Sequence, residues 1–519
     1  MTWQPEVNEL RERTALAHEM GGPERVGRQH DAGKLTIRER IDLLVDDGTF
    51  EEVGSLTGVG EYEDGRLTSF VPTPFVGGLA KIAGRRVVVG GEDFTVRGGS
   101  QPMKLDRPKG TFLEQMAKEW RLPLFVFLDG AGANIQHVND LGHTYLPSSP
   151  NVFGPMLEAA REVPVLGAVV GTIAGAVAAR AMLCHFTVMT RTTGAMFASG
   201  PPVVKRALGH DLTKFELGGA DVHVRISGAI DNEAESERAA IEQLRELFSY
   251  LPSTVYELPP VTSCDDPIDR AEEALLSIVP RRRTQPYDMK RIIEMVVDYG
   301  TYFEIQAQFG TSVVTALARV GGFPCGIVAN NPKVMGGALS ADGAEKQSHF
   351  LELCDHFHIP VVYLADVPGF MIGLQAEQRA TLRRGMRAYW VGYNMSVPTF
   401  TVVTRKNYGM AGQATGASHK LNYRVAWPSG EWGSIPIEGG VDAAYRREIE
   451  SAPDPAKRRA ELEAELSSLK SPFRTAEAFG IEDLIDPRQT RRYIGRFLEI
   501  AYRQLPQDLG LKSKAGVRP

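Results

Sequence analysis

Cysteine is scarce in this chain of 519 residues, which has only four. They lie far apart, at Cys184, Cys264, Cys325 and Cys354. No C-x-x-C pair occurs, so the sequence predicts neither a zinc ribbon nor a disulfide framework, and we expect no metal site. The motifs G-x-S-x-G, H-E-x-x-H and G-x-x-x-x-G-K-[ST] are absent as well, so no nucleophile elbow, zinc-protease helix or P-loop is predicted.

An excess of charge of either sign is also lacking. The 58 Lys and Arg residues against 64 Asp and Glu leave a net charge of −6. No dense basic stripe with interleaved aromatic residues occurs, so we expect no nucleic acid partner. Residues 1–20 have the pattern of a charged amphipathic helix without the apolar core of a signal peptide, which predicts a cytoplasmic protein. The length and the 43% of hydrophobic residues suit two or more domains.

One uncharged run resembles a membrane segment. Residues 163–181 read VPVLGAVVGTIAGAVAARA, with glycines four apart, a spacing that lets membrane helices approach closely. A spanning helix needs about 20 mostly apolar residues, and Arg180 ends this run early. A second copy begins at Val397, and its centre contains Arg405 and Lys406, which a simple membrane span does not tolerate. We therefore predict a buried strand followed by a tight turn of small residues, and no membrane partner.

Other segments repeat in the same order, which indicates a duplicated domain. Asp129 in RLPLFVFLDGAGA matches Asp366 in HIPVVYLADVPGF, 237 residues later. Gly98-Gly99 matches Gly336-Gly337, and LLVDDGTFEE resembles MVVDYGTYFE. Each copy alternates apolar β-branched runs with helical patterns, which predicts α/β domains with parallel sheets flanked by helices.

The boundary between the two copies is expected in a proline-rich region. Between Pro252 and Pro286 the alternating pattern is broken by LPSTVYELPPVTSCDDP and by PRRRTQPYDM. We therefore place one domain at residues 1–265 and the other at residues 266–519.

The glycine-rich turns after the repeated strands are candidate sites. Backbone approaches a ligand closely where no Cβ intervenes, and two N–H groups at a helix start can stabilise an oxyanion. The two candidates are the turns at residues 173–176 and 408–411. Close helix–sheet packing is the alternative explanation of both. Asp129 and Asp366 follow strands, and either could be an acid or base or cap the next helix.

Several motifs resemble those of one enzyme family along nearly the whole chain. They are residues 34–44 (KLTIRERIDLL), 98–100 (GGS), 215–220 (FELGGA), 285–289 (QPYDM), 366–370 (DVPGF), 404–409 (TRKNYG) and 485–491 (IDPRQTR). The chain resembles the carboxyltransferase (beta) subunits of biotin-dependent acyl-CoA carboxylases, such as those of propionyl-CoA carboxylase. This resemblance implies two tandem crotonase-like (ClpP/crotonase, β-β-α superhelix) domains.

The resemblance also implies an assembly and a division of roles. It implies a homohexamer, built as a trimer of dimers, with each active site between the first domain of one subunit and the second domain of its partner. The first domain would bind the acyl-CoA and hold its enolate. The second domain would hold the ureido oxygen of biotin. The enolate would then attack carbon dioxide released from carboxybiotin, and no side-chain base would be required.

The resemblance assigns site residues to both turns. The implied catalytic residues are Gly175, Ala176, Gly409, Met410 and Ala411. The implied substrate-binding residues are Gly98, Gly99, Gly130, Ala131, Gly132, Ala133, Ala174, Gln413 and Glu438. The chain departs from the family at Asn134, at Gly412-Gln413 and at residues 435–437. Because of these departures, the sequence does not identify the acyl group of the substrate.

Three alternatives remain from the sequence. A decarboxylase of malonyl-type CoA esters would have the same fold and run the same enolate chemistry backward. A crotonase-like hydratase or isomerase would need a carboxylate beside the thioester, and the candidates are Glu216 and Glu438. The third alternative is a non-catalytic scaffold subunit.

Biotin itself is expected on another chain. Carboxylases carry biotin on the lysine of a sequence close to A-M-K-M, and no Met-Lys-Met occurs here. Two crotonase-like domains also leave no room for a biotin carboxylase. We therefore expect a separate partner, the alpha subunit, that bears both the biotin and the biotin carboxylase.

Overall fold

The chain forms two compact units. The computed structural model describes residues 2–100, 108–130, 138–139, 142–144, 146 and 150–512. The first unit is Met1–Glu257 together with the segment from Gly510, and the second unit is Leu258–Leu509. The division falls before the expected one at residue 265. The segment after Leu258 packs on the second unit, where the Thr262 N–H donates to the Gly322 carbonyl at 3.1 Å.

The first unit is built on a seven-stranded sheet. Its order is β1 (Glu51–Glu52), β4 (Phe75–Ile82), β5 (Arg85–Glu92), β6 (Leu124–Leu128), β7 (Val165–Val169), β9 (Phe186–Thr190) and β11 (Asn232–Ala234). The pairs β1–β4 and β4–β5 are antiparallel, and the remaining pairs are parallel. A small parallel sheet pairs β8 (Thr172–Ala174) with β10 (Ala195–Phe197), and β2 (Gly58–Glu63) forms a hairpin with β3 (Arg66–Pro72).

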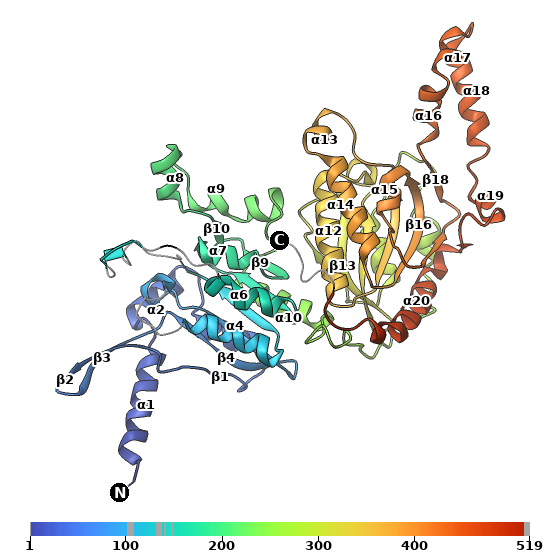
Figure 1. Ribbon diagram of the computed structural model, residues 1–519. Coiled ribbons are helices and arrows are strands. Elements are labelled where there is room, and N and C mark those ends of the chain that lie inside the picture. Colours follow the sequence, from blue (N-terminus) through green and yellow to red (C-terminus); the bar gives the residue numbers. More distant parts are fainter. Residues whose placement is uncertain are drawn as a thin grey trace. The chain divides into compact units, whose positions relative to one another are not determined.

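The described helices of the first unit are α1 (Gln4–His18), α2 (Pro23–Asp31), α3 (Ile37–Leu44), α4 (Lys109–Trp120), α6 (Pro150–Ala160), α7 (Ala176–Ala181), α8 (Pro201–Leu208), α9 (Lys214–Gly218) and α10 (Glu237–Tyr250). Helices such as α4, α6 and α10 lie against this sheet, whereas α1 and α8 project away from it (Figure 1). A 3-10 turn, η1, covers Arg97–Gly99, and a π-helical segment, η2, covers Asp221–Ile226.

The second unit has the same strand order. Its sheet runs β12 (Phe303–Ile305), β13 (Val313–Val320), β14 (Phe323–Asn330), β15 (Val361–Val367), β16 (Thr399–Tyr408), β17 (Asn422–Ala426) and β19 (Asp483–Leu484), and β18 (Glu431–Gly433) also pairs with β16. The first two pairs are again antiparallel and the others parallel. This correspondence confirms the predicted duplication.

The helices of the second unit include an arm. They are α11 (Met289–Val296), α12 (Ala341–His356), α13 (Leu374–Gln378), α14 (Thr381–Asn394), α15 (Gly409–Ala414), α16 (Ile437–Ala444), α17 (Arg446–Ser451), α18 (Pro455–Ser467), α19 (Pro472–Glu477) and α20 (Thr490–Gln504). Short 3-10 turns cover Glu273–Leu276, Met335–Gly337, Pro487–Gln489 and Leu505–Gln507. Figure 1 shows α16, α17 and α18 extending together from the second unit. Val441, Ile449 and Leu462 form a small core between them.

The duplication extends to single hydrogen bonds. In the first unit Asp46 accepts the N–H groups of Ala83 and Gly84 at 2.9 and 2.8 Å, which ties the end of α3 to the turn between β4 and β5. In the second unit Asp298 accepts those of Gly321 and Gly322 at 2.8 and 2.7 Å. The matched motifs LLVDDGTFEE and MVVDYGTYFE therefore have the same structural role.

The membrane-like run of residues 163–181 is a strand, a turn and a short helix. It contains β7, all of whose residues are buried, then β8, and then α7. The prediction of a buried strand followed by a turn of small residues is confirmed. Within the described ranges, no helix has the length and apolar character needed to cross a bilayer.

A substitution at Gly171 tests how tightly the end of β7 is packed. A Cβ atom there would lie 1.8 Å from the Oδ1 atom of the buried Asp129, so we expect Gly171→Ala to lower the unfolding free energy by about 1–3 kcal/mol through overpacking. Gly27→Ala in α2 is the matched control, because its Cβ would meet no described atom within 4 Å. Thermal unfolding measures both variants, and equal melting temperatures would contradict the packing described here.

Candidate active site

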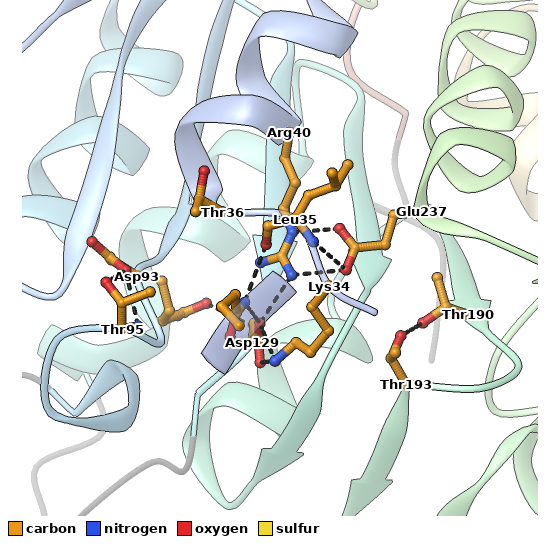
Figure 2. A network of polar contacts seen from close by, with 12 residues as sticks. Lys34, Leu35, Thr36, Arg40, Asp93, Thr95, Asp129, Thr190, Thr193 and Glu237 are labelled. Carbon is orange, nitrogen blue, oxygen red and sulfur yellow. Dashed lines mark hydrogen bonds and ion pairs between the residues drawn. The ribbon is translucent and has the colours of Figure 1, made fainter. Parts of the chain in front are cut away.

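A buried carboxylate of the first unit lies at the centre of a network of polar contacts (Figure 2). Asp129 follows β6 and has no exposed surface. The Lys34 Nζ lies 2.6 Å from its Oδ2 atom, and the Arg40 Nη2 lies 3.0 Å from the same oxygen. Arg40 also donates from Nε to Glu237, at the start of α10, at 2.7 Å. The network therefore joins α3 and the segment before it to β6 and α10.

In this network, opposite charges offset the cost of burying each ionised group. Burial opposes the charge on Arg40, but its hydrogen bonds to Glu237 and the charge of Asp129 raise the pKa of the guanidinium above its usual value. Burial lowers the pKa of Lys34, and Asp129 only partly offsets this effect. An isolated buried charge would be far more costly, so the cations and carboxylates stabilise one another.

The second unit has a carboxylate at the equivalent position. Asp366 in β15 is fully buried. Arg405 Nη2 lies 2.9 Å from its Oδ2 atom, and the Lys406 N–H donates to Oδ1 at 3.1 Å. The sequence left an acid or base role and a helix cap open for Asp129 and Asp366. The structure instead places both in buried ion pairs.

Two of the glycine segments meet above Asp129. Gly98 and Gly99 in η1 have φ angles of 63° and 76°, which glycine adopts without strain. A Cβ on Gly99 would lie 2.8 Å from the Asp129 carbonyl oxygen and 2.9 Å from the Cα of Gly130. The structure thus brings Gly99 and Gly130 together. Ala131, Gly132 and Ala133 lie outside the described residues.

The first candidate turn follows β8. Gly175, after Ala174, has a φ angle of 58°, and its N–H donates to the Phe197 carbonyl at 3.4 Å. Gly175 and Ala176 are both exposed. Among the described residues, no acceptor is recorded for the Ala176 N–H, which belongs to the first turn of α7. This exposed N–H is therefore a donor that remains for a ligand.

A cavity of about 520 Å³ in the first unit is lined in part by Thr172, the residue just before this turn. Its basic residues are Arg25, Arg28, Lys34, Arg97 and Lys214, and its other lining residues include Phe94, Gly98 and Thr172. The cavity joins η1 and the start of β8, and its charge suits an anionic ligand. Arg25, Arg28, Arg97 and Lys214 are not among the site residues predicted from the sequence, although the basic pair three residues apart in α2 is a readable signal.

The second candidate turn follows β16. Gly409 has a φ angle of 59°, and a Cβ there would lie 3.1 Å from the Ser434 carbonyl oxygen. Met410 is exposed, whereas Ala411 is fully buried. Gly409 and Gln413 line a second cavity of about 530 Å³, together with Thr401, Asn407, Gly412, Thr415, Asn422 and Arg424. Polar, mostly uncharged groups therefore surround this turn.

Gly412, one of the departures from the family, is closely packed in this structure. A Cβ at this position would lie 2.5 Å from the Oδ1 atom of Asn407. A larger residue at 412 would therefore displace Asn407, and the two residues form a matched pair beside the second turn.

The two carboxylates considered for hydratase chemistry have other partners. Glu216 forms a capping box with Thr213 at the start of α9, and the hydrogen bonds from Thr213 lower its pKa. Glu438 pairs with Arg283 at 2.5 Å. Partial burial opposes ionisation of Glu438, but a backbone hydrogen bond and Arg283 lower its pKa below the usual value. Both are kept ionised rather than poised for proton transfer near neutral pH.

No metal-binding arrangement is found in the part of the chain that the structure describes. There, His, Cys, Asp and Glu side chains form no group of three or more that could hold an ion.

Comparisons with known proteins establish the family. The model of the "Carboxyl transferase domain" family matches residues 28–512. The chain belongs to this family. It is 36% identical to the carboxyltransferase subunit of propionyl-CoA carboxylase from Haloferax mediterranei, over 95% of both chains. It is 33% identical to the alpha subunit of methylmalonyl-CoA decarboxylase from Veillonella parvula, over 94% of both chains.

A solved carboxyltransferase has the same fold. The structure of the transcarboxylase 12S hexamer with methylmalonyl-coenzyme A bound is 34% identical in sequence, covers 100% of this chain and 99% of its own, and superposes with a TM-score of 0.89. The predicted pair of crotonase-like α/β domains is thereby confirmed, as is the recognition of a carboxyltransferase of the propionyl- and methylmalonyl-CoA carboxylase family.

Removal of the Asp129 carboxylate tests the buried network. Asp129→Ala leaves two cations, Lys34 and Arg40, with Glu237 as the remaining carboxylate of the network. Because Arg40 stays fully buried, we expect the unfolding free energy to fall by about 3–5 kcal/mol. The exposed pair of Lys205 and Asp211 provides the control variant, Asp211→Ala, which should leave the melting temperature unchanged. If chemical denaturation shows the two variants to be equally stable, the network does not hold the unit together.

Proposed function

We propose that this carboxyltransferase moves a carboxyl group between biotin on a partner chain and the α-carbon of a short acyl-CoA of the propionyl or methylmalonyl type. The duplicated glycine turn at Gly175 and Gly409 carries the proposal. Each turn follows a strand at the same place in its unit and opens a short helix. The names of the relatives support the choice of acyl group.

The first unit would bind the acyl-CoA. The phosphates of coenzyme A are strongly anionic, and five basic residues line the cavity of this unit. Arginine forks and lysines are suited to phosphate oxygens. Thr172, which lines that cavity, lies three residues before Gly175 in the chain, so the thioester would extend from the cavity along β8 toward the Ala176 N–H.

The turn at Gly175 would stabilise the enolate. Removal of the α-proton of a thioester places negative charge on its oxygen, and N–H groups fixed in advance stabilise that charge without reorganisation. Because the donor is backbone, Ala176 can replace the glycine that is common in the family at this position. Ala174, Gly99 and Gly130 would shape the surrounding surface.

The second unit fits the uncharged ureido ring of biotin. The cavity beside Gly409 is lined by hydroxyl and amide side chains, including Thr401, Gln413 and Asn422, and these suit a neutral polar ring. Carboxybiotin, when bound, supplies the carboxyl group as carbon dioxide. The backbone at Gly409, Met410 and Ala411 would orient the ureido oxygen, and Glu438 would act indirectly through Arg283, which reaches the Tyr408 hydroxyl at 3.5 Å.

The assembly is part of the same proposal. The proposed enzyme is a homohexamer, a trimer of dimers, whose sites each combine the first unit of one subunit, the acyl-CoA side, with the second unit of another, the biotin side. An alpha partner carries the biotin and the biotin carboxylase.

Decarboxylation of malonyl-type CoA esters is the second candidate. The similarity to the decarboxylase subunit from Veillonella parvula favours it, and enolate stabilisation serves both directions equally. The capping role of Glu216 and the ion pair of Glu438 speak against a hydratase or isomerase.

Deletion of one backbone donor tests the first turn. Ala176→Pro removes the N–H and should lower kcat by about 10²- to 10³-fold, whereas Ala176→Gly keeps the donor and should retain activity. Proline is tolerated at the first residue of a helix, and the ψ angle of −122° at Gly175 lies outside the helical region that a following proline disfavours. A folded proline variant with activity within a few-fold of wild type would exclude this role.

A reconstitution assay tests the partner and the direction. We expect the purified chain to give no signal with streptavidin and to fix no bicarbonate alone. With a biotinylated alpha partner, ATP, bicarbonate and a panel of acyl-CoAs, it should carboxylate propionyl-CoA. ATP-independent loss of carbon dioxide from methylmalonyl-CoA alone would show that the protein is a decarboxylase. A streptavidin signal from this chain would contradict the proposal that biotin is carried by the alpha partner.

A further inference from the structure

A second buried ionic cluster lies next to the first candidate turn, and the proposed mechanism does not use it. Arg180, in the last turn of α7, pairs with Glu114 of α4 at 3.2 Å. Glu92, the last residue of β5, interacts electrostatically with both groups. The two carboxyl groups are almost fully buried, at 5% exposure for Glu92 and 4% for Glu114.

This cluster contacts the backbone of the candidate site. Glu92 accepts the Asp129 N–H at 3.3 Å. Its Cβ would lie 3.2 Å from a Cβ on Gly99, and its Cγ would lie 3.1 Å from one on Gly130. Arg180 lies one helical turn after Ala176, on the six-residue helix that the turn opens. The cluster therefore contacts η1 at Gly99 and the chain after β6 at Gly130, and it includes a residue of α7.

The second unit lacks this cluster, although its fold is the same. At the position of Glu92 it has Asn330, whose Oδ1 accepts the Asp366 N–H at 3.2 Å. The structural hydrogen bond thus needs no carboxyl group. By the spacing of the repeat, Leu351 and Ala414 occupy the positions of Glu114 and Arg180. Only the unit proposed to bind the acyl-CoA has the charges, so general demands of the fold do not explain them.

We propose that Arg180, held by Glu114 and Glu92, is a positioning residue that fixes α7 and with it the backbone donor at Ala176. The inference rests on the proposed role of that turn. A displacement of about 1 Å in a catalytic group can reduce turnover a hundred-fold, and a helix of six residues has little intrinsic stability of its own. An ionic anchor at its end therefore determines where its first turn lies.

The anchor should respond to pH. Burial raises the pKa of Glu114 to about 7, Arg180 opposes this rise and Glu92 adds to it. Burial also raises the pKa of Glu92. These two carboxyl groups and Arg180 face one another from α4, β5 and α7, the charge of Asp129 also raises the pKa of Glu92, and Cys184 lies near Glu114. Above neutral pH the ionised Glu114 pairs fully with Arg180, and below it the protonated group holds Arg180 less strongly.

Substitution of Arg180 separates positioning from binding. We expect Arg180→Met to lower kcat by about ten- to a hundred-fold while KM for the acyl-CoA stays within a few-fold, and Arg180→Lys to restore part of the loss. The protein should still fold, because the buried carboxyl groups can protonate. Lys118→Met is the matched control, since Lys118 is on the same helix as Glu114 and its ion pairs, with Glu119 and Glu158, lie at the surface.

Substitution of Glu114 tests the pH dependence. Wild-type kcat should rise through about pH 7, whereas Glu114→Gln, which cannot ionise, should stay at the low-pH level without an inflection. The folded pKa is raised above the unfolded value, so the contribution of Glu114 to stability is lost as the pH rises from about 4.5 to 7. The melting temperature of wild type relative to the Gln variant should fall over that range.

The outcomes distinguish this inference from the function on which it rests. If Ala176→Pro abolishes turnover but Arg180→Met behaves like Lys118→Met, the turn is catalytic and the anchor is not needed. If Glu114→Gln retains the wild-type pH profile, the inference is also overturned, whatever the fate of the Arg180 variants. If Ala176→Pro has no effect, the proposed role of the turn fails first.

Discussion

The ion pairs of a fully buried carboxylate hold the segments of the candidate site in the first unit together. Asp129 attracts Lys34 and Arg40, and Arg40 in turn holds Glu237, so the carboxylate joins three segments that are distant in sequence. Its own backbone packs against Gly99, and Gly171 must lack a side chain to make room for it. The turn at Gly175 begins only a few residues after Gly171. The position of the candidate oxyanion site therefore depends on a charge that performs no chemistry.

The architecture could be predicted from the sequence because its signals are local. β-Branched runs, small-residue turns and the motifs matched between the copies are each read within about ten residues, and their order is that of the two sheets. Glu216 shows how such a signal can also mislead. Its carboxylate suggested acid–base chemistry, but Thr213 stands three residues before it, and this spacing is that of the capping box found in α9.

The ion pairs could not be predicted in the same way. Asp129 and Lys34 are 95 residues apart in the sequence, and no pattern within either segment points to the other. The repeat does not help, since Asp366 takes its cations from the neighbouring strand, from the Arg405 guanidinium at 2.9 Å and the Lys406 Nζ at 3.8 Å. The buried carboxylate is common to both units, whereas the source of its counter-charge is not. A buried carboxylate needs an opposite charge nearby, and more than one segment of the chain can supply that charge.

The same reasoning explains why the proposed function resides in backbone. A donor N–H is present whichever residue occupies its position, proline excepted, so Ala176 and Met410 can stand where the family has glycine. The requirement that remains is conformational: Gly175 and Gly409 both have positive φ angles near 60°, where other residues are strained. Side chains then serve to hold the backbone in place, and the two units differ in how they do so. The second unit holds α15 through an amide, because Gln347 donates to the Ala414 carbonyl at 2.8 Å, whereas the first unit holds α7 through the charge of Arg180. A neutral tether does not titrate near pH 7, so of these two tethers only that of the first unit changes with pH in this range.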